Sequence, residues 1–588
     1  MLCVSPLVLK GQELDDVLSL LQSEEEGDLL GDDELIRLEL LMRNPLDLNR
    51  VDATELEGIP LVTSPDAALI IRARDSQGGF QSVDEAREIA GLSVVTARLL
   101  PLVTTVTPGI SGHFTLRNRW SAYNNDARIL TQGEFERSDL SWGFTLERDP
   151  GEPSLSDYVS GHMVFKAGEQ TAVFMGDHQV IAGYGLLFGP TTRPFKTPTG
   201  LTRFARLGKG LRPHRSTRER WALRGVAVDR TEKKNRLWVS LSVSPRTNDE
   251  NRKKGPATET VAAMTWERTT RENGRYGLLL AYDRWTLPGS SHDPRAPRTY
   301  GSFSGRIPLD DVDLFGEIAT HTGTPPAMTA GLIMVEKNLR WVLTVRRYPM
   351  GFHGPRSQPF REFSSERLNE SGVYQGMSLR WGNHRFLTHG DLYRRSPAPG
   401  VASGVVHGFE AIAQWTLHLR NRQLSFRWKG EKKTLQDRLI FPGEAVQKPF
   451  RKESWRFHGI LFPRRSFQFQ MQFDRSDVSD DGDRSRGYGV SLKVRYSRTP
   501  WRVTWNWTGF RVEESDARIT IWDLNLPAEL RIKTFSGTGH SMALLAGVAT
   551  PAGARVSIRM RSTWKLSPQQ TVWMKARLEG GLQMDIAL

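Results

Sequence analysis

The strongest constraint on the fold is an alternation of apolar and polar residues that recurs from about residue 107 to residue 588. Ser466–Asp474 reads SFQFQMQFD, so aromatic residues and a methionine alternate with glutamines. Gly489–Phe510 repeats the pattern on both sides of the turn Thr499-Pro500. Because side chains alternate between the two faces of a β-strand, a period of two predicts strands with one apolar and one polar face.

Several classes of large antiparallel structure are excluded by length and by the absence of repeats. A propeller would repeat a blade motif every ~40–50 residues, and the sequence has no such repeat. Soluble sandwiches usually stop at about 250 residues. A transmembrane β-barrel needs strands of about 10 residues with a lipid-facing apolar side and a polar luminal side. At about 20 residues per strand and connection, residues 107–588 predict a barrel of roughly 20–26 strands.

The charge of the chain is distributed unevenly. Lys and Arg number 80 against 66 Asp and Glu, which gives a net charge of +14. Residues 1–106 have a net charge of −12 and contain no tryptophan, whereas residues 107–588 have a net charge of +26 and contain all 17 tryptophans. A strongly basic chain invites a nucleic-acid interpretation. The partition weakens that interpretation, because the excess of positive charge lies in the predicted barrel.

The N-terminal part contains helical patterns. Leucines recur at helical spacing in an acidic stretch, and four short helices are predicted after it. Asp52 with Glu55 has capping-box spacing at the first of these helices, and Ser82 with Glu85 caps the third. The predicted fold class is therefore α+β and multidomain. Residues 1–12 are interpreted as the end of a signal peptide, and residues 13–43 as an acidic helical segment. Residues 44–106 are expected to form a compact all-α domain, and residues 107–588 the antiparallel barrel.

Residues 44–106 resemble the tandem helix-hairpin-helix domain of the competence protein ComEA. The matching pieces are Leu48-Asn49-x-x-Asp52-Ala53, Glu55-Leu56-x-x-Ile59-Pro60, Ala68-x-x-Ile71-x-x-Arg74 and Gly79-Phe80-x-x-x-Asp84-Glu85. In DNA-binding members of that family, backbone N–H groups of a glycine-rich hairpin turn meet a phosphate. The resemblance implies DNA-binding candidates at Thr63, Ser64, Arg72, Arg74, Gly91, Ser93 and Arg98.

The sequence departs from the DNA-binding pattern at the two hairpin turns. The first turn, residues 59–64, has no glycine, and the second keeps only Gly91. The domain is also net acidic, whereas phosphate binding needs positive charge. We therefore favour docking of a protein on this domain over binding of DNA, and both alternatives stay open.

The two parts together resemble the helix-hairpin-helix outer-membrane proteins of the Bacteroidetes–Chlorobi type. Residues 176–189, GDHQVIAGYGLLFG, are similar to a segment that these proteins carry early in the barrel. The resemblance implies a bacterial outer-membrane location with a periplasmic N-terminal domain. It also implies that the protein is a channel or an assembly component. A more specific hypothesis is that it takes part in DNA uptake during competence. The partners implied are outer-membrane lipid or lipopolysaccharide, DNA, and a periplasmic or envelope protein.

The sequence contains no motif that predicts catalysis. Gly183-x-Gly185-x-x-x-Gly189 lacks the Gly-Lys-Ser/Thr of a phosphate-binding loop, and these glycines are interpreted as bends or close packing. The 13 histidines show no paired ligand spacing, so no metal is predicted. His178 beside Asp177 has the composition of an acid–base pair, but it is interpreted as making a hydrogen bond in the lumen. No catalytic residue and no cofactor is predicted, and the chain is not expected to be an enzyme. The alternative is a soluble DNA-binding protein whose β-rich body binds nucleic acid.

Overall fold

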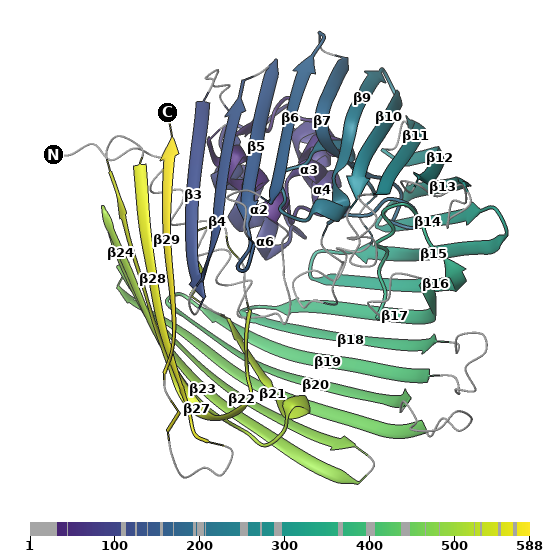
Figure 1. Ribbon diagram of the computed structural model, residues 1–588. Helices are drawn as coiled ribbons and strands as arrows, with labels where there is room; N and C mark the ends of the chain where they lie inside the picture. The colour runs from purple at the N-terminus through teal and green to yellow at the C-terminus, as the bar shows by residue number, and fades with distance from the viewer. Residues whose placement is uncertain are drawn as a thin grey trace.

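The structure is a computed structural model of the chain, shown in Figure 1. Its described part runs from residue 32 to residue 587, and the following residues within it are not described: 44, 107–112, 124–125, 138, 153–156, 169, 192–195, 197–204, 206, 247–256, 271–272, 287–296, 363–367, 396–405, 437–446, 465, 481, 523, 528, 530–531, 551–553, 568–572 and 575. The predicted signal-peptide segment 1–12 and the first half of the acidic segment 13–43 lie outside the described residues.

The body of the chain is a closed antiparallel barrel of 24 strands. β29 (Arg577–Ala587) pairs with β3 (His113–Tyr123) and so closes the ring. The strand number lies within the expected range, and the predicted antiparallel barrel is confirmed. The other barrel strands are β4 (Asp126–Glu136), β5 (Leu140–Arg148), β6 (Tyr158–Lys166), β7 (Thr171–Ile181), β9 (Leu223–Glu232), β10 (Asn235–Arg246), β11 (Ala257–Thr269), β12 (Arg275–Thr286), β13 (Arg298–Leu309), β14 (Val312–His321), β15 (Thr324–Val335), β16 (Leu339–Phe352), β17 (Leu368–Trp381), β18 (His384–Arg395), β19 (Val406–Leu419), β20 (Arg422–Gln436), β21 (Gln447–Arg464), β22 (Phe467–Asp480), β23 (Asp483–Arg498), β24 (Trp501–Val512), β27 (Gly537–Ala549) and β28 (Ala554–Lys565).

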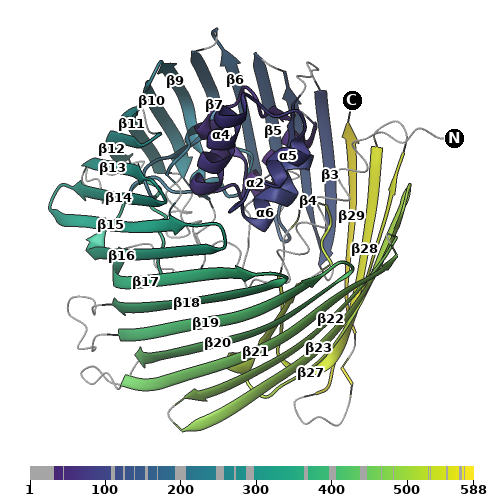
Figure 2. The same ribbon diagram turned by 180° about the vertical axis from the view of Figure 1, so that it is seen from behind.

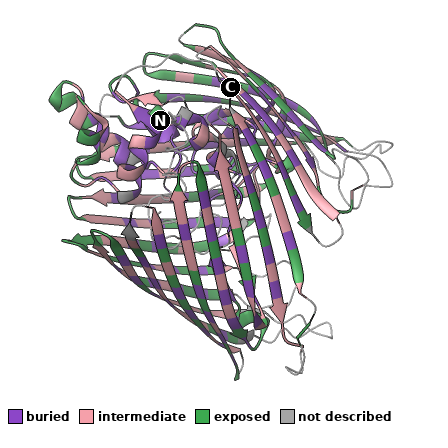
Figure 3. Ribbon diagram, turned by 90° about the vertical axis from the view of Figure 1, so that its left-hand side faces the viewer, coloured by how far each residue is buried: buried purple, intermediate pink, exposed green. Residues whose placement is uncertain are grey.

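The outer and inner faces of the barrel have the polarity of a membrane protein. On β22, Met471 and Phe473 are 45% and 41% exposed, whereas Gln472 between them is 7% exposed. Figure 3 shows the same alternation of buried and exposed residues along many strands. Apolar side chains outside and polar side chains inside are the reverse of a soluble protein, and they are typical of a barrel surrounded by lipid. The chain is therefore an outer-membrane-type β-barrel.

The two ends of the barrel differ in the length of their connections. At one end the strands are joined by short turns, as between β15 and β16 or between β23 and β24. The start of β3 and the end of β29 lie at this end as well. At the other end, long connections join β7 to β9 and β16 to β17. In outer-membrane barrels the short turns are periplasmic and the long loops extracellular.

Five helices precede the barrel, and residues 32–106 are called the helical unit below. Its helices are α2 (Asp32–Arg43), α3 (Ala53–Gly58), α4 (Ser64–Gln77), α5 (Val83–Arg87) and α6 (Val94–Val103). Four helices within 44–106 were expected, and they are confirmed, as are the caps at Asp52 and Ser82. α4 is longer than expected, because Thr63 caps its start and Gly78 ends it in a left-handed conformation. None of these helices is long and apolar enough to cross a membrane.

The helical unit has its own hydrophobic core, to which α2 contributes. Leu38 and Leu41 of α2 are buried with Leu56 of α3, Ile70 of α4 and Leu99 of α6. Two short parallel strands, β1 (Leu46–Asp47) and β2 (Thr104–Thr105), join the two ends of the unit. The described part of the acidic helical segment, α2, therefore packs on the domain that follows it.

The helical unit lies inside the ring of strands. Figures 1 and 2 show its helices enclosed by the barrel wall in two opposite views. Side chains of the unit form ion pairs with inward-facing residues of β3, β4, β13 and β16. The residues of β13 and β16 that are contacted lie near short turns, so the unit occupies the short-turn end of the lumen.

A second group of residues enters the lumen between β7 and β9. We call the described residues within 182–222 the luminal insertion. It follows β7, which bends at Gly176. This glycine has a φ of +84°, and a Cβ on it would lie 2.3 Å from the carbonyl oxygen of Gly161. The short strand β8 (Gly210–Pro213) pairs with the end of β7. Gly183 has a φ of +56° and packs against Glu317 of β14, so the interpretation of these glycines as bends and close packing is confirmed.

β29 is one continuous strand, because Gly580 and Gly581 continue the ladder beside Ala122 and Ser121. Two of the longest strands are β20, which extends to Gln436, and β21, which begins at Gln447. A hairpin of β25 (Ile519–Trp522) and β26 (Ile532–Phe535) packs against the inner wall.

Candidate functional site: a lumen closed by the helical unit

The contact between the helical unit and the barrel wall is centred on Arg340. This residue is the second of β16, beside the short turn that follows β15. Its Nη2 donates to Oδ1 of Asp66 at 2.5 Å and to the carbonyl oxygen of Gly91 at 2.6 Å. One guanidinium therefore holds both α4 and the turn before α6 against the wall.

The carboxylate of Asp66 is fully buried and surrounded by donors. Its Oδ1 accepts the backbone N–H of Ser93 at 3.0 Å, and its Oδ2 accepts the hydroxyls of Ser93 and Thr96 at 2.8 and 2.7 Å. Burial alone would raise the pKa of Asp66, but the charge of Arg340 and these hydrogen bonds outweigh it and hold the pKa below its ordinary value. Asp66 therefore supplies a permanent anion at the N-terminus of α6.

Three further ion pairs connect the helical unit to the wall. Glu57 of α3 accepts from Arg306 of β13 at 3.0 Å, and both side chains are largely buried. In α2, Glu39 accepts from Arg117 of β3 at 2.8 Å. Arg37 of the same helix pairs with a glutamate of β4 at 3.2 Å. In three of the four pairs the acid belongs to the helical unit and the arginine to the barrel, as the opposite net charges of the two parts require.

The structure brings only part of the predicted DNA-binding set together. Thr63 caps α4, and its hydroxyl donates to Oδ2 of Asp66 at 2.9 Å. Gly91 and Ser93 lie beside the same carboxylate at the second hairpin turn. Ser64 is the first residue of α4. The hairpin groups expected to meet a phosphate therefore surround Asp66 and Arg340 in this structure.

The three predicted arginines lie apart from this cluster. Arg74 donates to the carbonyl oxygen of Val51 at 2.6 Å, so it stabilises the fold of the helical unit. Arg98 is half-buried and lies near His418 of β19. Arg72 is exposed on α4. DNA binding at the seven residues stays a prediction.

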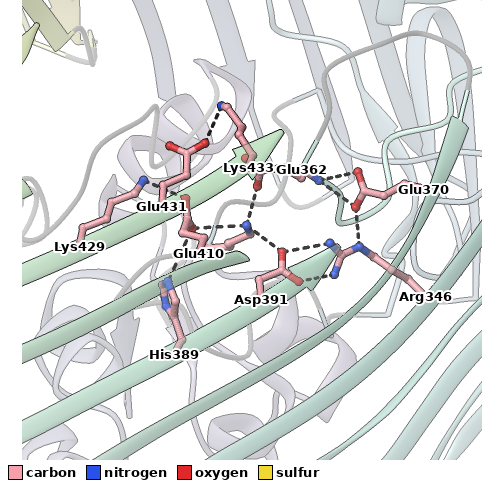
Figure 4. Close-up of polar contacts among 10 residues, drawn as sticks. Arg346, Glu362, Glu370, His389, Asp391, Glu410, Lys429, Glu431 and Lys433 are labelled. Atoms are coloured by element: carbon pink, nitrogen blue, oxygen red, sulfur yellow. Dashed lines mark hydrogen bonds and ion pairs between the residues drawn. The ribbon is translucent and has the colours of Figure 1, made fainter. Parts of the chain in front are cut away.

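The luminal insertion is held in place by a buried network of charges, shown in Figure 4. Nζ of Lys196 contacts carboxylate oxygens of Glu362, Asp391 and Glu410 at 2.5, 2.7 and 3.3 Å. Arg346 of β16 binds both oxygens of Asp391, at 2.8 and 3.0 Å. Burial alone would lower the pKa of the Lys196 ammonium, but the carboxylates around it hold the pKa well above its ordinary value.

The backbone of the insertion is also bound to the wall. The N–H groups of Tyr184 and Leu186 donate to Oε2 of Glu317 on β14, at 2.6 and 3.1 Å. His178 bonds to Ser240 and to the carbonyl oxygen of Gly176. Its neighbour Asp177 binds Arg224 of β9, whose side chain is half-exposed, instead of His178. The luminal hydrogen bond expected at this position is found for His178, with Ser240 as its partner.

A cavity of about 760 Å³ lies between the helical unit, the luminal insertion and the wall from β4 to β12. The part of its lining that carries positive charge consists of Arg37, Lys166, Lys209, Arg212, Arg215, Lys233, Lys234, Arg236 and Arg275. These are nine cations, against six Asp and Glu side chains in the lining. The residues described by the structure include no group of three or more His, Cys, Asp and Glu side chains that is arranged to hold a metal.

Sequence reasoning did not single out Arg340, Arg306, Arg117 or Lys196. The alternation of polar and apolar residues could have shown that each of these arginines lies on the polar, luminal face of its strand. Nothing in the sequence says which of the many luminal arginines meets the helical unit. Lys196 lies in a connection whose path depends on tertiary packing.

No protein-family model matches the sequence, and no curated protein matches it. Three solved structures are similar to this chain. The copper transporter OprC is 8% identical over 82% of this chain and 80% of its own, with a TM-score of 0.44. The siderophore receptor PirA from Pseudomonas aeruginosa is 8% identical over 83% of this chain and 82% of its own (TM-score 0.42), and the FrpB iron transporter from Neisseria meningitidis is 9% identical over 82% of each chain (TM-score 0.37).

Proposed function

We propose that this protein is an outer-membrane channel or transporter for anionic solutes, and that its helical unit is a plug at the periplasmic end. The observation that carries the proposal is the attachment of the unit to the inner wall by Arg340 and three further ion pairs. A barrel of this strand number encloses a lumen wide enough for water unless something fills it. A unit held by a few polar contacts, rather than by a continuous core, is able to move without unfolding the barrel.

The direction of selectivity follows from the charge inside. The cavity beside the helical unit is lined by nine cations and six anions, and residues 107–588 as a whole, inside and outside together, carry a net +26. Rings or patches of arginine and lysine in a pore favour the passage of anions. The exposed apolar belt argues against the alternative of a soluble, β-rich nucleic-acid-binding body, because large apolar side chains cover its outer face.

The helical unit is proposed to be a helix-hairpin-helix module that docks within its own chain. Its hairpin groups hold Asp66, and Asp66 holds Arg340, so the module uses its phosphate-binding geometry for an internal carboxylate. No contact of the described residues favours the version linked to DNA uptake. Lipopolysaccharide phosphates are proposed partners of exposed arginines near the long-loop end, such as Arg475, Arg484 and Arg486.

The proposal is tested by the conductance of the purified protein in planar lipid bilayers. The full chain is compared with a variant that lacks residues 1–106, and heat-modifiable gel mobility verifies that both barrels are folded. We expect the full chain to be nearly closed and the shortened barrel to form large, stable, anion-selective pores. Equal conductance of the two folded proteins would reject the plug.

A further inference from the structure

The cavity beside the helical unit is lined both by the luminal insertion and by short turns of the barrel. The luminal insertion, with Lys209 and Arg212, lines it from within the lumen. Residues of the short turns β9–β10 and β11–β12, including Lys233 and Asn273, also line it. The cavity therefore extends to the short-turn end, and described residues of the luminal insertion form part of its lining.

Three arginines of the cavity are paired with carboxylates of the wall. Arg37 pairs with Glu136 at 3.2 Å, and Arg236 binds both oxygens of Asp229, at 2.9 and 2.5 Å. Nε of Arg215, in the luminal insertion, is 3.2 Å from a carboxylate oxygen of Glu134 on β4.

Two other arginines of the same cavity, Arg212 and Arg275, have no carboxylate partner among the described residues. Among the described residues, no carboxylate lies within ion-pair distance of Arg212, and its buried Nε has no hydrogen-bond partner. Arg275 of β12 is almost fully buried and donates to the carbonyl oxygen of Gly208 at 2.8 Å, again without a carboxylate within ion-pair distance in the described part of the chain. Both side chains keep donors that match an oxyanion.

The electrostatic surroundings of Arg212 favour an added anion. Burial lowers the pKa of this guanidinium, and the nearby charges of Arg37 and Arg236 lower it further, whereas the charge of Asp229 acts in the opposite direction. A guanidinium stays protonated at neutral pH even when its pKa is lowered, so Arg212 keeps its positive charge at this site. Binding of an anion would relieve the repulsion among the three arginines.

We infer that the cavity binds a small multivalent oxyanion, with Arg212 and Arg275 as its principal ligands. This inference rests on the proposed function and names its substrate class, a solute that carries phosphate or several carboxylates. The volume of about 760 Å³ suits a small molecule up to the size of a nucleotide. The planar guanidinium matches phosphate and carboxylate oxygens in a bidentate way.

The inference is tested by isothermal titration calorimetry on the full chain in detergent, at about 50 mM salt to limit screening. Inorganic pyrophosphate is the first titrant, and citrate is the second, which distinguishes phosphate from carboxylate. The variants are Arg212→Gln and Arg275→Gln. The matched control is Arg511→Gln, which removes the same charge from an exposed residue of β24 at the opposite end of the barrel.

We expect each cavity variant to bind pyrophosphate about 10-fold more weakly or worse, since each loses a charge-assisted hydrogen bond, and the control to bind like the wild type. Binding of pyrophosphate alone assigns the site to phosphate compounds, and binding of both titrants assigns it to multivalent oxyanions. Absence of binding to the wild type up to about 10 mM of either titrant would overturn the inference. Unchanged binding by both folded cavity variants would also overturn it.

The two proposals fail in different ways. If the barrel without residues 1–106 is no more conductive than the full chain, but the full chain binds pyrophosphate through Arg212, the plug is wrong and the anion site stands. If the shortened barrel opens and the full chain binds neither titrant, the plug stands and the anion site is wrong.

Discussion

Arg340 of the barrel wall and Asp66 of the helical unit form a buried ion pair with an Nη2–Oδ1 distance of 2.5 Å, although 274 positions separate them in the chain. The same guanidinium binds the carbonyl oxygen of Gly91, and the same carboxylate binds the N-terminus of α6. This pair therefore couples the fold of the hairpins to their position in the lumen.

Arg340→Gln should loosen the helical unit. Removal of one partner from a buried ion pair costs about 3–5 kcal/mol, because the remaining charge is left without compensation. We expect this cost to weaken the binding of the helical unit to the barrel wall. Channel openings in planar bilayers should therefore become more frequent. Arg347→Gln, which removes an exposed arginine from the same strand, is the control and should conduct like the wild type. Closed pores in the Arg340 variant would show that the pair does not hold the plug.

The docked state should also weaken in acid. The pKa of Asp66 is lowered in the folded protein, so its contribution to stability is present above the unfolded value of about 3.9 and is lost as the pH falls through the lower folded value. We expect conductance to stay low from about pH 7 to pH 5 and to rise only below about pH 4. Asp66→Asn should conduct already at neutral pH and lose this acid-induced rise. A rise between pH 5 and 7 in the wild type would point to another group.

Much of the fold follows from local patterns, and the placement of the helical unit does not. The period of two on β22 fixes which side chains face lipid, and the cap at Asp52 fixes where α3 begins. These signals act over a few residues. The contact of Asp66 with Arg340 depends on how a closed ring positions a strand far along the chain, and one luminal arginine looks like another in the sequence. Complementary net charge was the one hint that the two parts associate.

DNA binding by the hairpins competes with docking, because Gly91 and Ser93 already surround Asp66. We expect the full chain in detergent to leave a short DNA duplex unshifted in a gel at about 50 mM salt, where phosphate contacts are strong. The Arg340→Gln variant, whose unit is released, is the sensitive case. A shift by that variant that Arg72→Gln abolishes would restore the DNA hypothesis, and absence of a shift in both proteins would leave docking as the use of the unit.

Lys196→Gln should release the luminal insertion. The change leaves Asp391 and Glu410 with less positive charge in a region from which water is largely excluded, although Arg346 still binds Asp391. We expect faster hydrogen exchange of the backbone amides of Tyr184 and Leu186, measured by mass spectrometry, with unchanged exchange in the helical unit. Lys234→Gln, in a short turn, is the control. Equal exchange in the two variants would mean that Lys196 does not fasten the insertion.

The orientation of the wall is tested by a pair of substitutions on β22. Met471 is exposed on the outer face, and its neighbour Gln470 is on the luminal face. An arginine facing lipid near the bilayer midplane costs about 2–4 kcal/mol, whereas a luminal arginine stays hydrated. We therefore expect Met471→Arg to lower the urea midpoint of the folded barrel in lipid vesicles, followed by heat-modifiable mobility, and Gln470→Arg to change it much less. The opposite order would mean that the apolar face of β22 does not contact lipid.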